Sequence, residues 1–408
     1  MSSTTATKSD SYYGWVMVFV GFTLSAMSFG GLGMVGVFLK PMIAEFGWSR
    51  GETSLGFSIA ALSAAGFGIL WGFFADRQPT RRFLLMAAGA LAIALLLLSQ
   101  VTAYWQYLLA YFLFGAFGHA AVAATVWANI GEWFAQNKGL ALGLGLAGSA
   151  LGQAVVPFSA RLLITAYDWQ TAYLVLGLVY LALGLAVAAL TRDPPAKSAR
   201  LASQIGSPPG RGAWSLGSAK TTVAWFAVAV IFCCSCMSVA IVHIVPAVSD
   251  NGFKPEIAAS VLTTVMLAGA IGRLCSGKLC DTIGPLQTYA MMSLGQTCLV
   301  IWFPHMASLT SIYVLAAVFG FFFSGVMSSM IICVNYMVPA EVAARSWATV
   351  SLFAWIGMGL GSYMGGALFD LTGGYTWSFA FAAIMGCGNL AVLLAYHFNG
   401  GRREPVLA

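Results

Sequence analysis

Charged residues are scarce in this sequence. Asp, Glu, Lys and Arg make up 8% of its 408 residues, against about 25% in an average soluble domain. Apolar residues make up 60% of the chain, and the mean hydropathy is +0.85. So little polar surface excludes a soluble protein. The net charge of +6 is spread over short loops without a basic stripe, so no nucleic-acid partner is expected either.

Residue groups that carry out catalysis or bind metals are also missing. The eight cysteines all lie in apolar runs without paired ligand motifs, which indicates small core residues rather than disulfides or zinc ligands. The segment Gly272–Leu279 nearly matches a phosphate-binding loop, but Leu279 stands where that loop needs Ser or Thr, and no strand precedes it. We therefore expect neither an enzyme nor a bound cofactor. The energy for any active process must then come from ion or solute gradients across a membrane.

Twelve apolar runs reach the length of a membrane span, about 20 residues. They predict an all-α, multi-pass membrane protein whose helices contact the lipid bilayer. The first run is too long for the core of a signal peptide and should remain in the protein. The predicted spans are roughly 14–39, 54–75, 83–101, 106–131, 139–163, 170–191, 221–245, 257–280, 286–304, 309–336, 347–370 and 376–398.

Lysine and arginine predict the orientation of these spans. Fourteen of the 19 cations lie at the termini and in the loops after even-numbered spans. The opposite loops hold only Lys40, Arg50, Arg161 and Lys254. Positively charged loops stay on the cytoplasmic side. We therefore expect both termini in the cytoplasm and the chain in the cell (inner) membrane.

An internal repeat relates the two halves of the chain. Gly72–Asp76 recurs as Gly277–Asp281 at an offset of 277 − 72 = 205, and Gly47 recurs as Gly252 at the same offset. Repeated apolar bundles of this kind are typical of membrane transporters. Two more pairs keep offsets of 206 and 208, namely Asn129 with Asn335 and Tyr167–Trp169 with Tyr375–Trp377.

The repeat predicts two six-helix bundles, residues 1–191 and 221–408, joined by a cytoplasmic linker, 192–220. Glycines recur at helical spacing in one span of each bundle. Small residues one turn apart allow helices to slide, as rocking bundles need, or only to pack tightly, and the sequence leaves both readings open. These glycines are Gly139, Gly143, Gly148 and Gly152 in the fifth span, and Gly357, Gly361 and Gly365 in the eleventh.

A cluster of charges follows the second span. A carboxylate at a helix end beside arginines can form a cytoplasmic latch that one conformation makes and another breaks. A cluster that only sets the topology, without a gating role, is the alternative. The residues are Asp76, Arg77, Arg81 and Arg82, with Asp281 in the partial copy of the second half. Their pattern resembles the loop signature of the major facilitator superfamily, with Pro79 where that family usually has glycine.

Arg273 is the strongest candidate for a binding residue. It lies eight residues before Asp281, about 12 Å inside the cytoplasmic end of its span. An arginine at that depth costs at least ~2.5–3.5 kcal/mol on insertion scales, so it should face a cavity. None of the 13 acidic residues lies in the middle of a predicted span. This predicts a substrate carboxylate as the counter-ion of the guanidinium fork, with backbone carbonyls and amide side chains as the alternative partners.

Several short motifs are distributed along most of the chain. They are Tyr13-Gly14-Trp15, Phe46–Arg50, Asn129–Phe134 followed by Lys138, Ala147–Ser149 and Tyr167–Trp169. Together they resemble the monocarboxylate porter family and its relatives, the oxalate:formate antiporters. The resemblance implies that an arginine on the eighth span, here Arg273, binds the carboxylate of the substrate.

Two departures limit what the resemblance implies. Mammalian-type members carry a lysine in the first span and an aspartate one turn before the arginine, where this chain has Gly33 and Gly269. Their proton relay therefore does not carry over. The antiporters have a second cation on the eleventh span, whereas residues 347–369 contain no Lys or Arg. One fixed positive charge favours a monocarboxylate over a dicarboxylate.

The repeat and the resemblance together predict a proton-coupled symporter of short monocarboxylates, such as L-lactate or pyruvate, that works by alternating access as a monomer. We expect the proton to cross with the bound acid. His119 in the fourth span is the alternative proton carrier, unless it is only a packed core residue. An organic-anion exchanger is the alternative function. The side chains expected around the substrate, besides Arg273, are His119, Gln153, Phe323, Ser324, Ser328, Asn335, Tyr336 and Trp355. Hydrogen bonding between helices is the alternative role of the polar side chains in this set.

Overall fold

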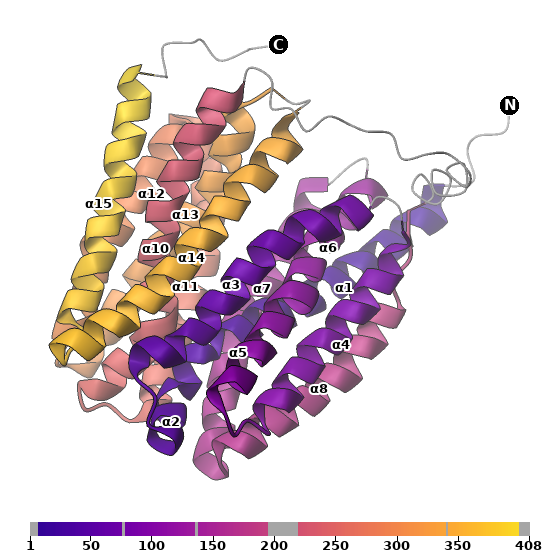
Figure 1. Ribbon diagram of the computed structural model, residues 1–408. Coiled ribbons are helices and arrows are strands. Elements are labelled where there is room, and N and C mark those ends of the chain that lie inside the picture. Colours follow the sequence, from indigo (N-terminus) through magenta and orange to yellow (C-terminus); the bar gives the residue numbers. More distant parts are fainter. Residues whose placement is uncertain (1–6, 76–77, 135–137, 195–218, 340–341, 400–408) are drawn as a thin grey trace, which may run out of the picture. The chain divides into compact units, whose positions relative to one another are not determined.

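The computed structural model describes residues 7–75, 78–134, 138–194, 219–339 and 342–399, which form helices and no strands (Figure 1). The predicted all-α class is confirmed. The helices are α1 (Thr7–Gly33), α2 (Val35–Phe46), α3 (Arg50–Ala75), α4 (Thr80–Leu98), α5 (Tyr104–Leu113), η1 (Phe114–His119), α6 (Ala120–Trp133), α7 (Lys138–Ala166), α8 (Trp169–Ala189), α10 (Lys220–Asp250), α11 (Pro255–Ile283), α12 (Pro285–Val300), η3 (Phe303–His305), α13 (Leu309–Met337), α14 (Ala343–Thr372) and α15 (Thr376–Asn399).

Within the described residues, eleven helical stretches are long and apolar enough to cross a membrane. Helices α1 and α2 count as one stretch, and so do α5, η1 and α6. The ninth predicted span, 286–304, is the one without such a stretch. It corresponds to α12, which has only 16 residues and is followed by the short 3₁₀ helix η3. The chain is therefore a multi-pass membrane protein.

Contacts divide the chain into two compact units. The first unit contains α1, the part of α3 from Gly66 onward, and α4 to α8. The second contains α2, the part of α3 up to Ala65, and α10 to α15. The segment 35–65, which the sequence assigned to the N-terminal bundle, thus packs within the second unit. The bundle boundaries at 191 and 221 stay a prediction.

The same helix crossing occurs once in each unit. In the first unit α1 packs along α7, and in the second α10 packs along α14. A Cβ at Gly152 of α7 would overlap the carbonyl of Ala26, and one at Gly361 of α14 would overlap the carbonyl of Ser235. Gly152 and Gly361 are therefore points where two helix backbones touch. Gly148 and Gly357 make similar approaches to backbone carbonyls, whereas a Cβ at Gly365 would meet the His243 ring. Nothing lies within 4 Å of a Cβ built on Gly143, and Gly139 lies outside the residues whose surroundings are described.

The two paired glycines of the repeat each lie just after the end of a helix, at equivalent places in the two halves. Gly47 follows α2 with φ +69°, and Gly252 follows α10 with φ +90°. This left-handed conformation costs glycine little because it has no Cβ. The N–H of Gly47 donates to the carbonyl of Ile43 at 2.9 Å, which closes the last turn of α2. The offset of 205 residues therefore reflects a turn that both halves share.

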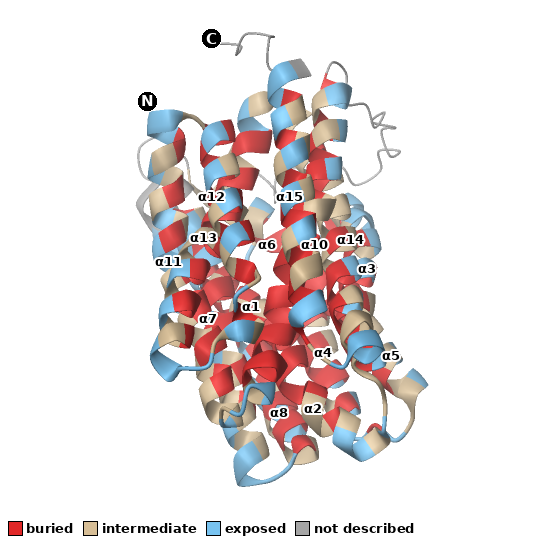
Figure 2. Ribbon diagram, turned by 90° about the vertical axis from the view of Figure 1, so that its left-hand side faces the viewer, coloured by how far each residue is buried: buried red, intermediate tan, exposed pale blue. Residues whose placement is uncertain are grey.

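Helix α10 forms the interior of the second unit. Every residue from Cys233 to Val248 is buried, and α10 contacts α2, α11, α14 and α15 (Figure 2). The large side chains of Ile384 and Leu394 on α15 are exposed instead, as expected for a surface that contacts lipid. The expectation of buried cysteines holds for Cys233, Cys234, Cys236, Cys280 and Cys333 and is wrong for Cys298 and Cys387, which are exposed, while Cys275 is half-buried.

Candidate functional site

Arg273 lies well inside α11. It follows Pro255 by 18 residues and precedes Ile283 by 10, about 27 Å and 15 Å along the helix axis. The side chain is half-buried, and its Nη2 donates to Met327 Sδ on α13 at 3.9 Å. A guanidinium at this depth is costly in a membrane and presents a planar fork of donors that matches a carboxylate.

Helices α11 and α13 approach each other closely around Arg273. A Cβ at Gly269 would overlap Ser324 Oγ, and a Cβ at Gly272 would overlap the carbonyl of Phe321. An aspartate at position 269, as in mammalian-type porters, has no space while the two helices keep this distance. The departure of the sequence at Gly269 is therefore part of a close helix crossing.

The other predicted substrate residues of the second unit are buried to different extents. Phe323 is 1% exposed and packs on Phe319 with ring centroids 5.6 Å apart, and Ser324 is fully buried against Gly269. Ser328 and Trp355 are half-buried. Asn335 and Tyr336, near the end of α13, are exposed. Phe323 and Ser324 thus belong to helix packing, and Ser328 on α13 is more accessible.

His119 ends a π-helical segment in the first unit. Phe114–His119 forms η1 between α5 and α6, and such π segments are frequent at functional sites. The His119 side chain is 1% exposed. Its Nδ1 lies 2.6 Å from Ser28 Oγ, and its ring makes an edge contact with Phe29. These contacts favour the reading of His119 as a packed, hydrogen-bonded core residue.

We predict that His119→Asn will leave the proton dependence of the predicted monocarboxylate uptake unchanged. The amide keeps a polar contact to Ser28 but cannot titrate near neutral pH. The measurement is the initial rate of the predicted monocarboxylate uptake by reconstituted vesicles across a series of pH gradients. A variant that works without any response to the gradient would show that His119 carries the proton.

Gln153 lies beside Gly33, the position that the resemblance matches to a lysine of mammalian-type porters. It is 7% exposed, and its Nε2 donates to the carbonyl of Ser149 in the same helix at 3.2 Å. A Cβ at Gly33 would lie 3.7 Å from Gln153 Cγ and 3.2 Å from Pro157 Cγ. Gln153 therefore occupies the space around position 33 of the first unit.

The structure leaves the predicted cytoplasmic latch untested. Arg81 and Arg82 are exposed at the start of α4, and Arg82 Nη1 donates to Gln78 Oε1 at 3.1 Å. Asp281 is exposed near the end of α11. Asp76 and Arg77 lie outside the described residues. The latch stays a prediction.

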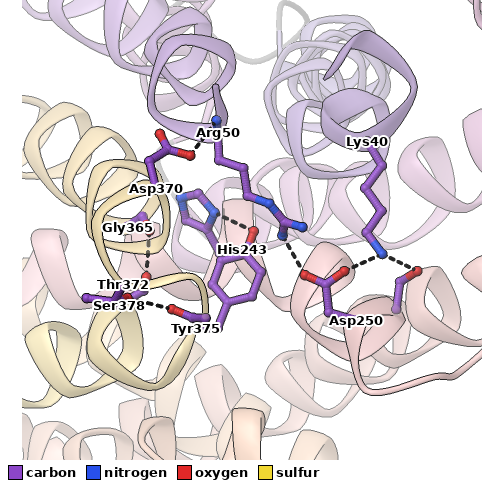
Figure 3. Close-up of polar contacts among 11 residues, drawn as sticks. Lys40, Arg50, His243, Asp250, Gly365, Asp370, Thr372, Tyr375 and Ser378 are labelled. Carbon is purple, nitrogen blue, oxygen red and sulfur yellow. Dashed lines mark hydrogen bonds and ion pairs between the residues drawn. The ribbon is translucent and has the colours of Figure 1, made fainter. Parts of the chain in front are cut away.

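A polar cluster in the second unit was missed by the sequence analysis. We call it the Arg50 cluster, made of Lys40, Arg50, Asp250, Asp370 and Tyr375 (Figure 3). Lys40 Nζ lies 2.5 Å from Asp250 Oδ1, and Arg50 Nη1 lies 2.6 Å from Asp250 Oδ2. Burial raises the pKa of Tyr375, which keeps its phenol neutral. The only sequence signals were charges at helix ends, and these do not reveal their partners.

Comparisons with known proteins agree with this architecture. A solved bacterial homologue of the human lysosomal transporter Spinster superimposes with a TM-score of 0.72 at 15% identity, over 96% of this chain and 97% of that one. Monocarboxylate transporter 13 of Rattus norvegicus is 27% identical over 95% of this chain and 90% of that protein. The riboflavin transporter RibJ of Trypanosoma brucei brucei is 28% identical over 48% of this chain.

A family model decides the classification. The model described as the Major Facilitator Superfamily matches residues 21–353, which is most of the chain. The relatives that match over most of the chain include monocarboxylate transporters, and the solved structure with a similar fold is also that of a transporter. The chain is therefore a membrane transporter, not an enzyme, and it belongs to the major facilitator superfamily.

Proposed function

We propose that this transporter carries short monocarboxylates, such as L-lactate or pyruvate, together with a proton. The observation that carries the proposal is the position of Arg273, a cation held in the interior of a membrane-spanning helix. The similarity to proteins named monocarboxylate transporters supports the same substrate class. Arg273 binds the carboxylate, and the rest of the small substrate contacts nearby polar and apolar side chains.

Arg273 suits one carboxylate because of its geometry and its surroundings. Its guanidinium can donate two parallel hydrogen bonds to the two carboxylate oxygens, which a lysine cannot do. The neighbouring Met327, whose sulfur accepts a hydrogen bond from Arg273 Nη2 at 3.9 Å, has a soft side chain beside which a methyl group can pack. Residues 347–369 of α14 supply no second cation. A dicarboxylate would therefore bring an unmatched negative charge into the membrane.

In this proposal the coupling proton crosses with the substrate. The substrate binds Arg273 as a carboxylate, and the coupling proton then binds one of the two carboxylate oxygens. The acid crosses with this proton attached, so the protein needs no separate proton carrier. Transport follows alternating access between the bundles 1–191 and 221–408. Both termini lie in the cytoplasm, where the proposed latch of Asp76, Arg77, Arg81, Arg82 and Asp281 stabilises one conformation.

Uptake into liposomes tests this function. We expect the purified protein to accumulate labelled L-lactate in liposomes that contain no substrate when an inward proton gradient is applied. Dissipating the gradient with a protonophore should abolish the accumulation, since the gradient supplies the energy. Liposomes without protein are the control for passive entry of the neutral acid. Uptake that requires a second anion inside the liposomes would replace symport with organic-anion exchange.

A further inference from the structure

Helices α10 and α15 form a shallow apolar groove where the first turns of α10 pack against the last turns of α15. The groove measures about 130 Å³ and is open on one side. Both helices are long and apolar enough to span the membrane, and the function proposed above does not use this surface. The lining residues are Trp225, Phe226, Val392, Leu393 and Tyr396.

Packed aromatic rings form the floor of the groove. Deeper along the two helices, a Cβ at Gly388 of α15 would lie 2.7 Å from the ring of Phe232, so α10 and α15 approach closely there. Nearer the helix ends, Tyr396 takes up the space between them. Its ring centroid lies 5.3 Å from that of Phe226 and 6.3 Å from that of Trp225. Rings of this size fill the contact between the helices and leave a depression beside it.

The floor of the groove is buried, and its rim faces outward. Phe226, Leu393 and Tyr396 are 1%, 3% and 6% exposed, whereas Trp225 and Val392 at the rim are half-buried. In a membrane, a depression with apolar walls is filled by hydrocarbon, because a polar group there would lose its hydrogen bonds to water. An acyl chain that lies along the groove meets this requirement.

The protein surface beyond the groove is positively charged. Lys220 begins α10, five residues before Trp225 and about 7.5 Å from it along the helix axis. Its side chain is exposed. The first three turns of α10 and the last three turns of α15 contain no Asp or Glu. The charge next to the groove is therefore complementary to an anion.

We propose that this groove binds an anionic phospholipid of the cytoplasmic leaflet. One acyl chain lies along the groove, and the phosphate pairs with the ammonium group of Lys220. Tryptophan and tyrosine, here Trp225 and Tyr396, are enriched at the depth where headgroups meet hydrocarbon. Basic pockets between helices on the cytoplasmic side attract anionic headgroups, and this end of α10 lies on the predicted cytoplasmic side. The inference goes beyond the proposed transport and does not depend on its substrate.

A lipid fits this surface better than another polypeptide does. An extended segment would bring backbone N–H and C=O groups to apolar walls that cannot satisfy them. A second copy docked here by two-fold symmetry would place two Lys220 ammonium groups at the same level of one interface, where they repel each other. A phospholipid carries its negative charge at one end and only hydrocarbon along the rest, which matches both parts of the surface.

Photo-labelling in nanodiscs tests the lipid site without any transport measurement. The full-length protein is reconstituted in phosphatidylcholine with a trace of phosphatidylglycerol that carries a diazirine on its acyl chain close to the glycerol. Phosphatidylethanolamine with the same diazirine is the zwitterionic comparison. Peptide mass spectrometry measures the labelled fraction of segments 220–226 and 392–398.

Two variants separate the charge from the groove. Lys220→Gln removes the cation, and Lys278→Gln, an exposed cation near the end of α11 on the same predicted side, is its matched control. Val392→Phe fills the groove from its half-buried rim. Leu394→Phe is the control for added bulk, because Leu394 is 58% exposed and does not line the groove.

We expect phosphatidylglycerol to label both segments about fivefold more than phosphatidylethanolamine, and Lys220→Gln to abolish this preference. Val392→Phe should lose the labelling by both lipids, and the two controls should behave like the wild type. Equal labelling by the two lipids, or an unchanged preference in Lys220→Gln, would overturn the anionic site. Labelling that persists in Val392→Phe would show that lipid only covers the surface. The absence of labelling in the wild type would show that the chain itself or a second copy occupies the groove, which also overturns the proposal.

Discussion

Replacing Arg273 with glutamine should lower proton-driven lactate uptake by about 100-fold or more, because it removes the charge that pairs with the substrate carboxylate. Arg273→Lys should also fail, since lysine keeps the charge but loses the two parallel hydrogen bonds of the guanidinium. Initial uptake rates in liposomes with equal amounts of protein measure the effect. The loss should not come from misfolding, because Arg273 is half-buried and removing a cation from a membrane helix lowers its desolvation cost.

Lys254→Gln is the matched control for this experiment. Lys254 is an exposed cation at the start of the same helix, far from Arg273 along α11. The Lys254→Gln variant should transport lactate like the wild type. The size-exclusion profiles of Arg273→Gln, Arg273→Lys and Lys254→Gln should match. Normal uptake by Arg273→Gln would remove Arg273 from the substrate site.

The second large effect is expected at the paired helix crossings. Gly152→Val should sharply reduce the yield of monodisperse protein, since its Cβ would collide with the carbonyl of Ala26 on α1. Gly361→Val should do the same at Ser235 on α10. Neither obstacle is a flexible side chain, so the helices must separate, at a cost of about 3 kcal/mol or more. That is a large share of a typical folding free energy of about 5–15 kcal/mol.

Gly143→Val provides the control on the same helix as Gly152. Gly143 is exposed, and nothing lies within 4 Å of its Cβ position. The substitution adds the same side chain to α7 without a collision, so yield and melting temperature should stay close to those of the wild type. Equal losses at 143 and 152 would indicate a general effect of valine in α7 rather than contact between backbones.

Much of the fold could be predicted from the sequence because membrane-spanning helices are visible as long apolar runs. Apolar runs gave the spans, and the paired glycines at 47 and 252 marked turns that the structure places at equivalent helix ends. The break at Met34 between α1 and α2 was not visible, and neither was the π-helical segment Phe114–His119. Both are local backbone adjustments inside apolar runs, where composition does not change.

The site was less predictable, since its geometry depends on helix packing. Arg273 stood out because a charge inside a span is rare. Ser324 was expected near the substrate, yet its burial against Gly269 depends on the close approach of α11 and α13, which hydropathy cannot show. The contact between Arg50 and Asp370 joins residues 320 positions apart. Arg50 was assigned to a loop and Asp370 lies at the end of a predicted span, and only the folded chain reveals that they are partners.

Direct binding tests the central claim, that Arg273 recognises a carboxylate. The measurement is isothermal titration calorimetry of L-lactate and of its neutral amide, lactamide, with purified wild-type protein and Arg273→Gln. We predict that the wild type binds lactate and not lactamide, and that the variant binds neither, because recognition depends on pairing one negative charge with the guanidinium. Binding of lactate by Arg273→Gln with wild-type affinity, or equal binding of lactamide by the wild type, would contradict this account.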